Sequence, residues 1–198
     1  MVKVKILATY IPKQKIIFIH ISKAGGTSVT NWIHKNFNGF QTGPKHCRID
    51  RIKQKNIDFN YHFTIIRNPF ARVHSWFHYH KKLQTQNKLI DKKQRWKNSN
   101  KTTFADWVLT TSMKANVKNS IWWTQKSFID IHLEHDACKL ENINSDFQRI
   151  QRRLDCFKPL PVTNTSKHNH YRKDYTPETR KIIEEHFQED FEYFGYDF

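Results

Sequence analysis

Hydrophobic and polar positions along this chain change repeatedly between the period of a strand and the period of a helix. Short β-branched and aromatic runs at residues 15–20 (KIIFIH) and 61–66 (YHFTII) predict two buried strands. The alternating segment 128–133 (FIDIHL) predicts a third strand. Because β-branched and aromatic side chains pack well on a pleated surface, we expect these segments to form the sheet of the fold.

Helix signals lie between and after these strands. The expected helices run from a glycine pair to about Asn36, over 71–83 after Pro69, over 103–111, 117–124 and 144–154, and from Thr176 to about Asp190. Strands that alternate with helices predict an α/β fold with a central, largely parallel sheet flanked by helices. At 198 residues the chain is expected to be a single domain, residues 1–198, in which the polar, basic stretch 84–101 is an insertion or a substrate-side loop.

The chain is strongly basic, with 34 Lys and Arg against 18 Asp and Glu and a formal net charge of +16. Such a field attracts nucleic acids, anionic membranes, or polyanionic small molecules and glycans, and charge alone does not choose among them. The three cysteines form no CxxC pair, so neither a disulfide framework nor a zinc knuckle is indicated. The first twenty residues hold no apolar run as long as a membrane span or a signal-peptide core, which predicts a cytoplasmic protein.

A glycine-rich turn joins the first strand to the first helix, with the sequence Lys23-Ala24-Gly25-Gly26-Thr27-Ser28. A strand–turn–helix arrangement aims backbone N–H groups and the positive end of the helix dipole at an anion. Lys23 adds a mobile charge, and Thr27 and Ser28 add hydroxyls and N-cap chemistry. The lysine precedes the glycines, whereas a Walker-type ATPase loop places it after them, so that class is disfavoured. Taken alone, the motif also fits a plain strand–helix turn.

Arg67 follows the second strand, and Ser75 lies eight residues later in the next helix. Ligands of open α/β sheets collect at the carboxyl ends of the strands, where Arg67 is expected. An arginine fork and a serine hydroxyl that converge there would suit a second phosphate. Taken alone, Arg67 also fits a strand-end ion pair and Ser75 fits a helix-surface position.

Together these segments resemble the sulfotransferase superfamily that uses 3′-phosphoadenosine 5′-phosphosulfate (PAPS), in its membrane-type and bacterial carbohydrate branches. The resemblance rests on residues 19–28 (IHISKAGGTS), 65–77 (IIRNPFARVHSWF), 133–147 (LEHDACKLENINSDF) and 161–198. It covers nearly the whole chain and is weakest over 84–116. A departure is Ala24, where relatives often carry threonine; the change removes a hydroxyl donor and leaves the backbone intact.

The resemblance implies a P-loop-like three-layer domain with PAPS as sulfate donor and adenosine 3′,5′-bisphosphate as product. It implies that residues 25–28 hold the 5′-phosphate and that Arg67 and Ser75 hold the 3′-phosphate. Lys23 would stabilise charge that grows on the bridging oxygen as the bisphosphate leaves. The acceptor would be a hydroxyl, with a glycan favoured. No metal is expected, since lysine, arginine and the helix dipole supply the positive charge.

The acceptor hydroxyl needs a base near neutral pH, and the chain has 12 histidines. In the resembling carbohydrate enzymes a histidine between the two nucleotide motifs is commonly the base, which implies His46. His20 and His62 lie on expected strands and are assigned to the core or to a supporting position behind the site residues. His74 and His78 share a helix face at a spacing that permits a metal site, but a basic helix face is the favoured interpretation and no metal is predicted.

Two further groups are assigned with alternatives open. Ser166, Lys167 and Arg172 lie in a polar stretch that, by resemblance, closes over the nucleotide; a solvated loop is the alternative. Trp122, Trp123 and Gln125 are assigned to the acceptor side, where the tryptophans would stack on a sugar ring; core packing is the alternative for the tryptophans.

Three other functions compete with a PAPS-dependent sulfotransferase. A relative that binds the nucleotide without catalysis would keep the same motifs. A basic nucleic-acid-binding protein would explain the charge of +16 and leave the glycine turn and the segment 65–77 unexplained, so no nucleic-acid partner is predicted. A nucleotide kinase would need a Walker lysine and acidic magnesium ligands, which the sequence does not offer.

Overall fold

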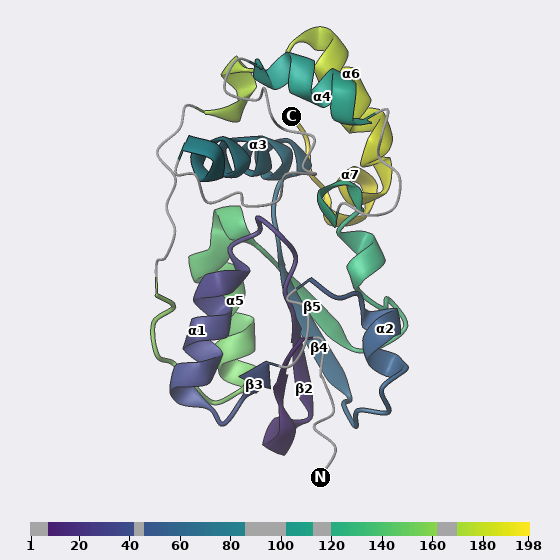
Figure 1. Ribbon diagram of the computed structural model, residues 1–198. Coiled ribbons are helices and arrows are strands. Elements are labelled where there is room, and N and C mark those ends of the chain that lie inside the picture. The colour runs from purple at the N-terminus through teal and green to yellow at the C-terminus, as the bar shows by residue number, and fades with distance from the viewer. Residues whose placement is uncertain (1–7, 42–45, 86–101, 113–119, 162–169) are drawn as a thin grey trace. The chain divides into compact units, whose positions relative to one another are not determined.

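The computed structural model describes residues 8–41, 46–85, 102–112, 120–161 and 170–198 (Figure 1). Contacts group the chain into two compact units. The first comprises residues 1–67 and 124–165, and the second comprises residues 68–123 and 166–198. The nucleotide motifs of the sequence are divided between them, so each unit is described by itself.

The first unit is built on a five-stranded sheet with the order β3-β1-β2-β4-β5. Its strands are β1 (Thr9–Ile11), β2 (Ile16–Ile19), β3 (Phe40–Gln41), β4 (Tyr61–Ile66) and β5 (His135–Lys139). β2, β4 and β5 pair in parallel, and β1 is antiparallel to both of its neighbours, so β1 alone among the described strands runs against the others. The predicted largely parallel sheet is confirmed.

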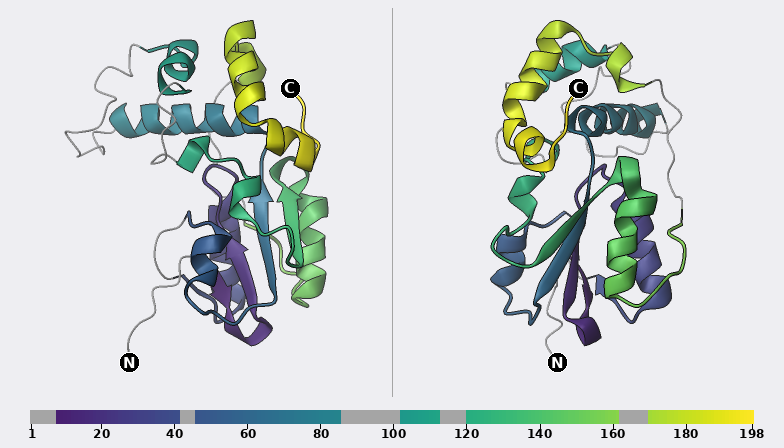
Figure 2. Two further views of the ribbon diagram at one scale, coloured as in Figure 1. Left: turned by 90° about the vertical axis from the view of Figure 1, so that its right-hand side faces the viewer. Right: turned by 180° about the vertical axis from the view of Figure 1, so that it is seen from behind.

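Helices cover both faces of this sheet. α1 (Gly26–Asn36) and α5 (Ile143–Arg153) lie on one face and α2 (Ile49–Lys53) lies on the other (Figures 1 and 2). The main core lies beneath α1 and α5, where Phe18 and Phe63 of the sheet meet Trp32 and Phe147 of the helices. The sequence predicted this three-layer arrangement. Three short 3₁₀ helices complete the unit: η1 (Pro12–Gln14), η3 (Lys126–Phe128) and η4 (Leu140–Asn142).

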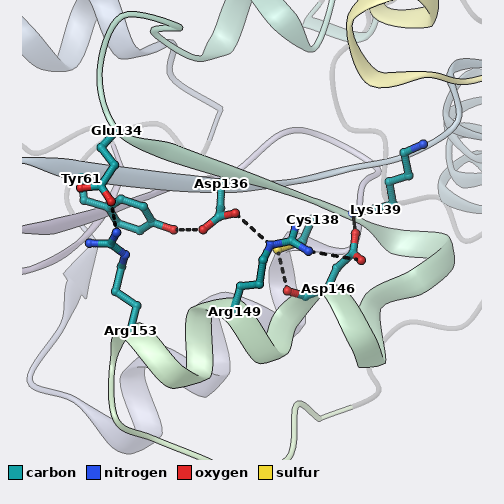
Figure 3. Close-up of polar contacts among 8 residues, drawn as sticks. All are labelled: Tyr61, Glu134, Asp136, Cys138, Lys139, Asp146, Arg149 and Arg153. Carbon is teal, nitrogen blue, oxygen red and sulfur yellow. Dashed lines mark hydrogen bonds and ion pairs between the residues drawn. The ribbon is translucent and has the colours of Figure 1, made fainter.

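A chain of polar contacts fastens β4 and β5 to α5 (Figure 3). The buried Tyr61 hydroxyl donates to Asp136 at 2.6 Å, and Asp136 also accepts from Arg149 at 3.0 Å. Asp146 of α5 accepts from the backbone N–H of Lys139 at 2.8 Å and so ends β5 at the helix start. Each buried polar atom here has a partner, which is the condition under which buried polar groups stabilise a fold.

The second unit is helical. It contains α3 (Pro69–Thr85), α4 (Phe104–Ser112), η2 (Ser120–Trp122), η5 (Tyr171–Lys173), α6 (Pro177–His186) and α7 (Gln188–Phe194). Aromatic rings fill its core, among them Phe70, Trp107, Trp122 and Phe187. α6 begins as the sequence predicts, because Thr176 caps it and Pro177 occupies its first position. None of the helices in the described ranges is long and apolar enough to span a membrane.

The structure corrects several sequence-based expectations. Residues 128–133 are not a strand: Asp130 closes a turn there by accepting from the backbone N–H of His132 at 2.9 Å. The strand is the next segment, β5. The described part of 117–124 forms the 3₁₀ helix η2 in place of an α-helix, and the last helix divides at Phe187 into α6 and α7. β1 was not predicted.

Candidate functional site

The glycine-rich turn follows β2 and has an unusual backbone. Lys23 has φ +64° and Gly25 has φ +82°, both in the left-handed region. That conformation is uncommon for lysine, and residues held in it cluster at functional sites. A Cβ on Gly25 would lie 2.7 Å from a methyl carbon of Leu140, and one on Gly26 would lie 2.3 Å from the His20 ring. The turn therefore has room only for glycine at these positions, because protein packs against it closely.

The turn leads directly into α1, whose first residue is Gly26 and whose N-cap is Gly25. The expected N-cap role of Thr27 and Ser28 is therefore wrong, since both lie inside the helix. The first N–H groups of a helix carry its positive dipole end, and in α1 the Ser28 N–H also donates to the Gly25 carbonyl at 3.1 Å. Ala24 is fully buried, so its side chain serves packing, and its replacement of a hydroxyl residue leaves the backbone of the turn in place.

Arg67 follows β4 at the same edge of the sheet, because β2 and β4 are parallel and Ile19 is level with Thr64. Its guanidinium Nη1 donates to the backbone carbonyl of Lys23 at 3.3 Å. The structure thus brings together the two motifs of the first unit that the sequence linked only by analogy. The Arg67 guanidinium thus lies beside the backbone of the turn.

Gln125, which the sequence analysis assigned to the acceptor side, holds the backbone of Arg67. Its side-chain oxygen accepts from the Arg67 N–H at 2.9 Å, and its side-chain nitrogen donates to the Arg67 carbonyl at 2.8 Å. Gln125 is fully buried. A side-chain amide has the donor and acceptor needed to pair with one peptide unit in this way. Gln125 is therefore a positioning residue for Arg67.

His46 lies beside the turn. Its Nδ1 is 2.9 Å from the backbone carbonyl of His20, and the two rings pack edge to face with centroids 4.9 Å apart. A carbonyl only accepts, so Nδ1 carries the hydrogen and Nε2 keeps a lone pair in the neutral ring. His20 itself is buried and its ring contacts Gly26, so the core assignment of His20 is confirmed. His46 therefore contacts His20, and the His20 ring in turn packs against Gly26, the first residue of α1.

The remaining predicted site residues belong to the second unit. Ser75 is almost fully buried on α3. Arg172 lies in η5, where it donates to the carbonyl of Phe198 and lies 5.5 Å from that residue's ring centroid. Ser166 and Lys167 lie outside the described residues. Trp122 is buried in the aromatic core, which favours packing over sugar stacking.

One histidine and one cysteine of the first unit, His62 and Cys138, have structural roles. His62 is fully buried, and its Nε2 accepts from the backbone N–H of Asp130 at 3.3 Å. Burial, with His135 stacked beside it, lowers the pKa of His62 to about 4, so the ring is neutral. Burial raises the pKa of Cys138 to about 12, so this thiol is inert near neutral pH.

A glycine-rich turn at a helix N-terminus, with an arginine bound to its backbone and a histidine beside it at the carboxyl edge of a largely parallel sheet, is typical of α/β proteins that bind an anion. The model of the sulfotransferase family matches residues 8–197 of the chain. The chain therefore belongs to the sulfotransferase family, and it is an enzyme of the transferase class.

Individual proteins show weaker similarity to this chain than the family model does. No curated protein matches the chain in sequence. Among solved structures, the mouse sulfotransferase SULT7A1 complexed with PAP is similar, with 14% identity over 89% of this chain and 83% of that chain and a TM-score of 0.46.

Proposed function

We propose that this enzyme transfers the sulfuryl group of PAPS to a hydroxyl group, with a glycan as the acceptor class and His46 as the base. One observation carries the proposal: the turn at residues 23–28, Arg67 and His46 gather at the carboxyl edge of the sheet through bonds to the carbonyls of Lys23 and His20. Positive charge and a base at one place are what transfer of an anionic group to a hydroxyl requires.

The residues present fit a phosphosulfate. Backbone N–H groups are available in the turn, where Lys23 and Gly25 have left-handed backbone conformations, and in the first turn of α1. Because glycine has no side chain, these N–H groups can approach the oxygen atoms of a phosphate closely. The Lys23 ammonium neutralises the charge that develops on the bridging oxygen as the bond between sulfur and that oxygen breaks. Arg67 adds a fixed cation at the same edge, and its fork suits a phosphate.

His46 provides the proton acceptor. With Nδ1–H donated to the His20 carbonyl, Nε2 takes the proton from the acceptor hydroxyl while its oxygen forms the new bond to sulfur. The bond from sulfur to the bridging oxygen breaks, and adenosine 3′,5′-bisphosphate leaves with that electron pair. Charge balances because the lost hydroxyl proton resides on His46 until solvent removes it.

Two residues of the second unit are also assigned to the nucleotide by resemblance to the family. Ser75 would bind the 3′-phosphate, and Arg172 would contact the bound nucleotide. Ser166 and Lys167 are assigned to the same group by resemblance to the family. The glycan acceptor rests on resemblance to the carbohydrate branch and on the charge of +16, which suits uronic-acid or sulfated sugars.

The first experiment measures ligand binding by thermal shift with adenosine 3′,5′-bisphosphate, ATP and duplex DNA. We expect stabilisation by the bisphosphate and little by the others. A shift with DNA alone would favour a nucleic-acid-binding protein, and no shift with the bisphosphate would refute the donor assignment. Labelled PAPS is then offered with glycan, peptide and phenol acceptors. Bisphosphate binding without transfer to any acceptor would indicate a non-catalytic relative.

The base is tested with His46→Ala, and His34→Ala serves as the matched control because His34 is an exposed histidine on α1. We expect His46→Ala to lose transfer by about 100-fold or more while bisphosphate affinity stays unchanged. His34→Ala is expected to retain full transfer. Retained turnover in His46→Ala would assign the base to another residue.

A further inference from the structure

A cluster of metal-ligating groups lies in the second unit, and none of its members has a role in the proposed transfer reaction, although Ser75 adjoins it on α3. His74 and His78 of α3 meet Asp174, the residue that follows η5. The His74 Nε2 atom is 2.7 Å from Asp174 Oδ2 and 3.0 Å from His78 Nε2. His78 Nε2 is 3.8 Å from the same carboxylate oxygen. Three ligand atoms from two distant parts of the chain thus face one point.

These separations match those of ligands around one cation. Two atoms each about 2.1 Å from a zinc ion lie about 3.0 Å apart at a right angle and about 3.4 Å apart at a tetrahedral angle. The three measured distances, 2.7, 3.0 and 3.8 Å, lie on both sides of these values. Small rotations of His78 and Asp174, which are about a third exposed, suffice to equalise them.

Hydrogen bonding alone satisfies this arrangement poorly. A neutral imidazole nitrogen carries one hydrogen or one lone pair. If His74 Nε2 carries a hydrogen and His78 Nε2 a lone pair, one hydrogen serves both the carboxylate and the His78 nitrogen; if both nitrogens carry hydrogens, the two donors face each other across 3.0 Å. If His74 Nε2 carries the lone pair, it faces the carboxylate oxygen at 2.7 Å with no hydrogen between them. A cation that replaces the hydrogen accepts a lone pair from all three atoms at once.

The surroundings hold the ligands in place and leave an approach open. His74 is fully buried, and its ring packs edge to face on Phe104 at a centroid distance of 5.1 Å. The His78 ring packs edge to face on Phe77. An apolar shell that fixes ligand orientation raises metal affinity. The exposed sides of His78 and Asp174 give a cation a path from solvent.

We propose that His74, His78 and Asp174 bind a divalent transition metal, for which Zn²⁺ is the expected ion. Two imidazoles and one carboxylate form a borderline ligand set that suits zinc, and three protein ligands leave a fourth position for water. The cation fastens the segment before α6 to α3, two segments separated by 100 residues in the sequence. This role is independent of the sulfuryl transfer proposed above.

The test uses the full chain without a histidine tag, stripped of metal by a chelator and titrated calorimetrically with Zn²⁺. We expect one tightly bound equivalent and a rise in Tm. His78→Gln and Asp174→Asn each remove one ligand and should weaken binding by about 100-fold or more, since loss of even a supporting contact costs 10–100-fold. The matched control is His80→Gln, because His80 lies on the same helix outside the cluster and packs on Trp76. It should bind zinc as the wild type does.

A second measurement needs no variant. Histidines are modified with diethyl pyrocarbonate with and without one equivalent of Zn²⁺, and the modified residues are identified by mass spectrometry. Zinc should protect His78, the more exposed of the two histidine ligands. Absence of tight binding, equal affinity in His78→Gln and Asp174→Asn, or protection of other histidines would each overturn the proposal. Both readouts omit nucleotide, so they stand whether or not PAPS is the donor.

Discussion

Replacement of Gln125 tests how the arginine of the site is held. Gln125 is fully buried and makes two hydrogen bonds, 2.9 and 2.8 Å long, to the N–H and C=O of Arg67. Gln125→Leu keeps the volume and removes both partners. Each hydrogen bond contributes about 1 kcal/mol net, and each buried backbone group left unsatisfied costs about 1–3 kcal/mol. We therefore expect a loss of about 2–5 kcal/mol in the free energy of unfolding.

The magnitude is measured by urea denaturation, with Gln151→Leu as the control. Gln151 also donates its side-chain amide to a backbone carbonyl, that of Lys158 at 2.8 Å, but on the exposed surface. Its loss should cost less than about 1 kcal/mol, because water replaces the partner. Gln125→Glu adds a finer test, since a carboxylate keeps the acceptor for the Arg67 N–H and loses the donor to the Arg67 carbonyl.

The functional consequence follows from the same contacts. If Arg67 binds a phosphate, release of its backbone should weaken adenosine 3′,5′-bisphosphate binding by about tenfold or more, measured by calorimetry at a temperature where the variant is folded. Gln151→Leu should leave that affinity unchanged. A Gln125→Leu protein with wild-type stability and wild-type affinity would refute the positioning role.

Three other predictions concern the first unit. Gly26→Ala places a Cβ 2.3 Å from the buried His20 ring, so packing strain of about 1–3 kcal/mol should exceed the gain of about 1 kcal/mol in helix propensity; a Tm above that of the wild type would contradict this. The pKa of His62 is lowered from 6.5 to about 4, so the unfolded chain takes up a proton first and stability falls as the pH drops from 6.5 towards 4. This contributes about 2 kcal/mol between pH 7 and pH 5, and a His62→Gln variant should lose that part of the pH profile in urea titrations. Tyr61→Phe removes the hydroxyl bonded to Asp136 and should cost about 1–2 kcal/mol by urea denaturation, with an unchanged midpoint as the refuting result.

The parts of the fold that the sequence predicted are those with strong local signals. β2 and β4 are short β-branched runs with every residue buried, so hydrophobic pattern and environment agree. β5 (HDACK) carries no such signal, and only Cys138 of its residues is buried. Its strand conformation comes from pairing with β4, a partner more than 70 positions away. Pairing with a neighbouring strand overrides local propensity, so the sequence of β5 alone does not predict a strand.

The candidate site divides in the same way. The sequence predicted that the turn and Arg67 lie at the same edge of the sheet, because each follows a strand with a strong hydrophobic pattern; their roles, and that of His46, stay predictions. The positioning role of Gln125 could not be predicted, since it depends on its side chain meeting the backbone of a residue 58 positions earlier. For His74 and His78 the helical spacing permitted a metal site that the sequence analysis did not favour, because Asp174 lies 100 positions away from His74 and only the fold brings it near.

His46 and Arg67 share one property: each is fastened to a main-chain carbonyl, of His20 and of Lys23. A main-chain carbonyl is present whichever side chain the residue carries, so a substitution at His20 or Lys23 does not remove the acceptor. Mutational dissection can therefore separate charge from placement here. Lys23→Ala removes the ammonium and keeps the backbone carbonyl that accepts from Arg67, so the two contributions of this residue can be tested separately.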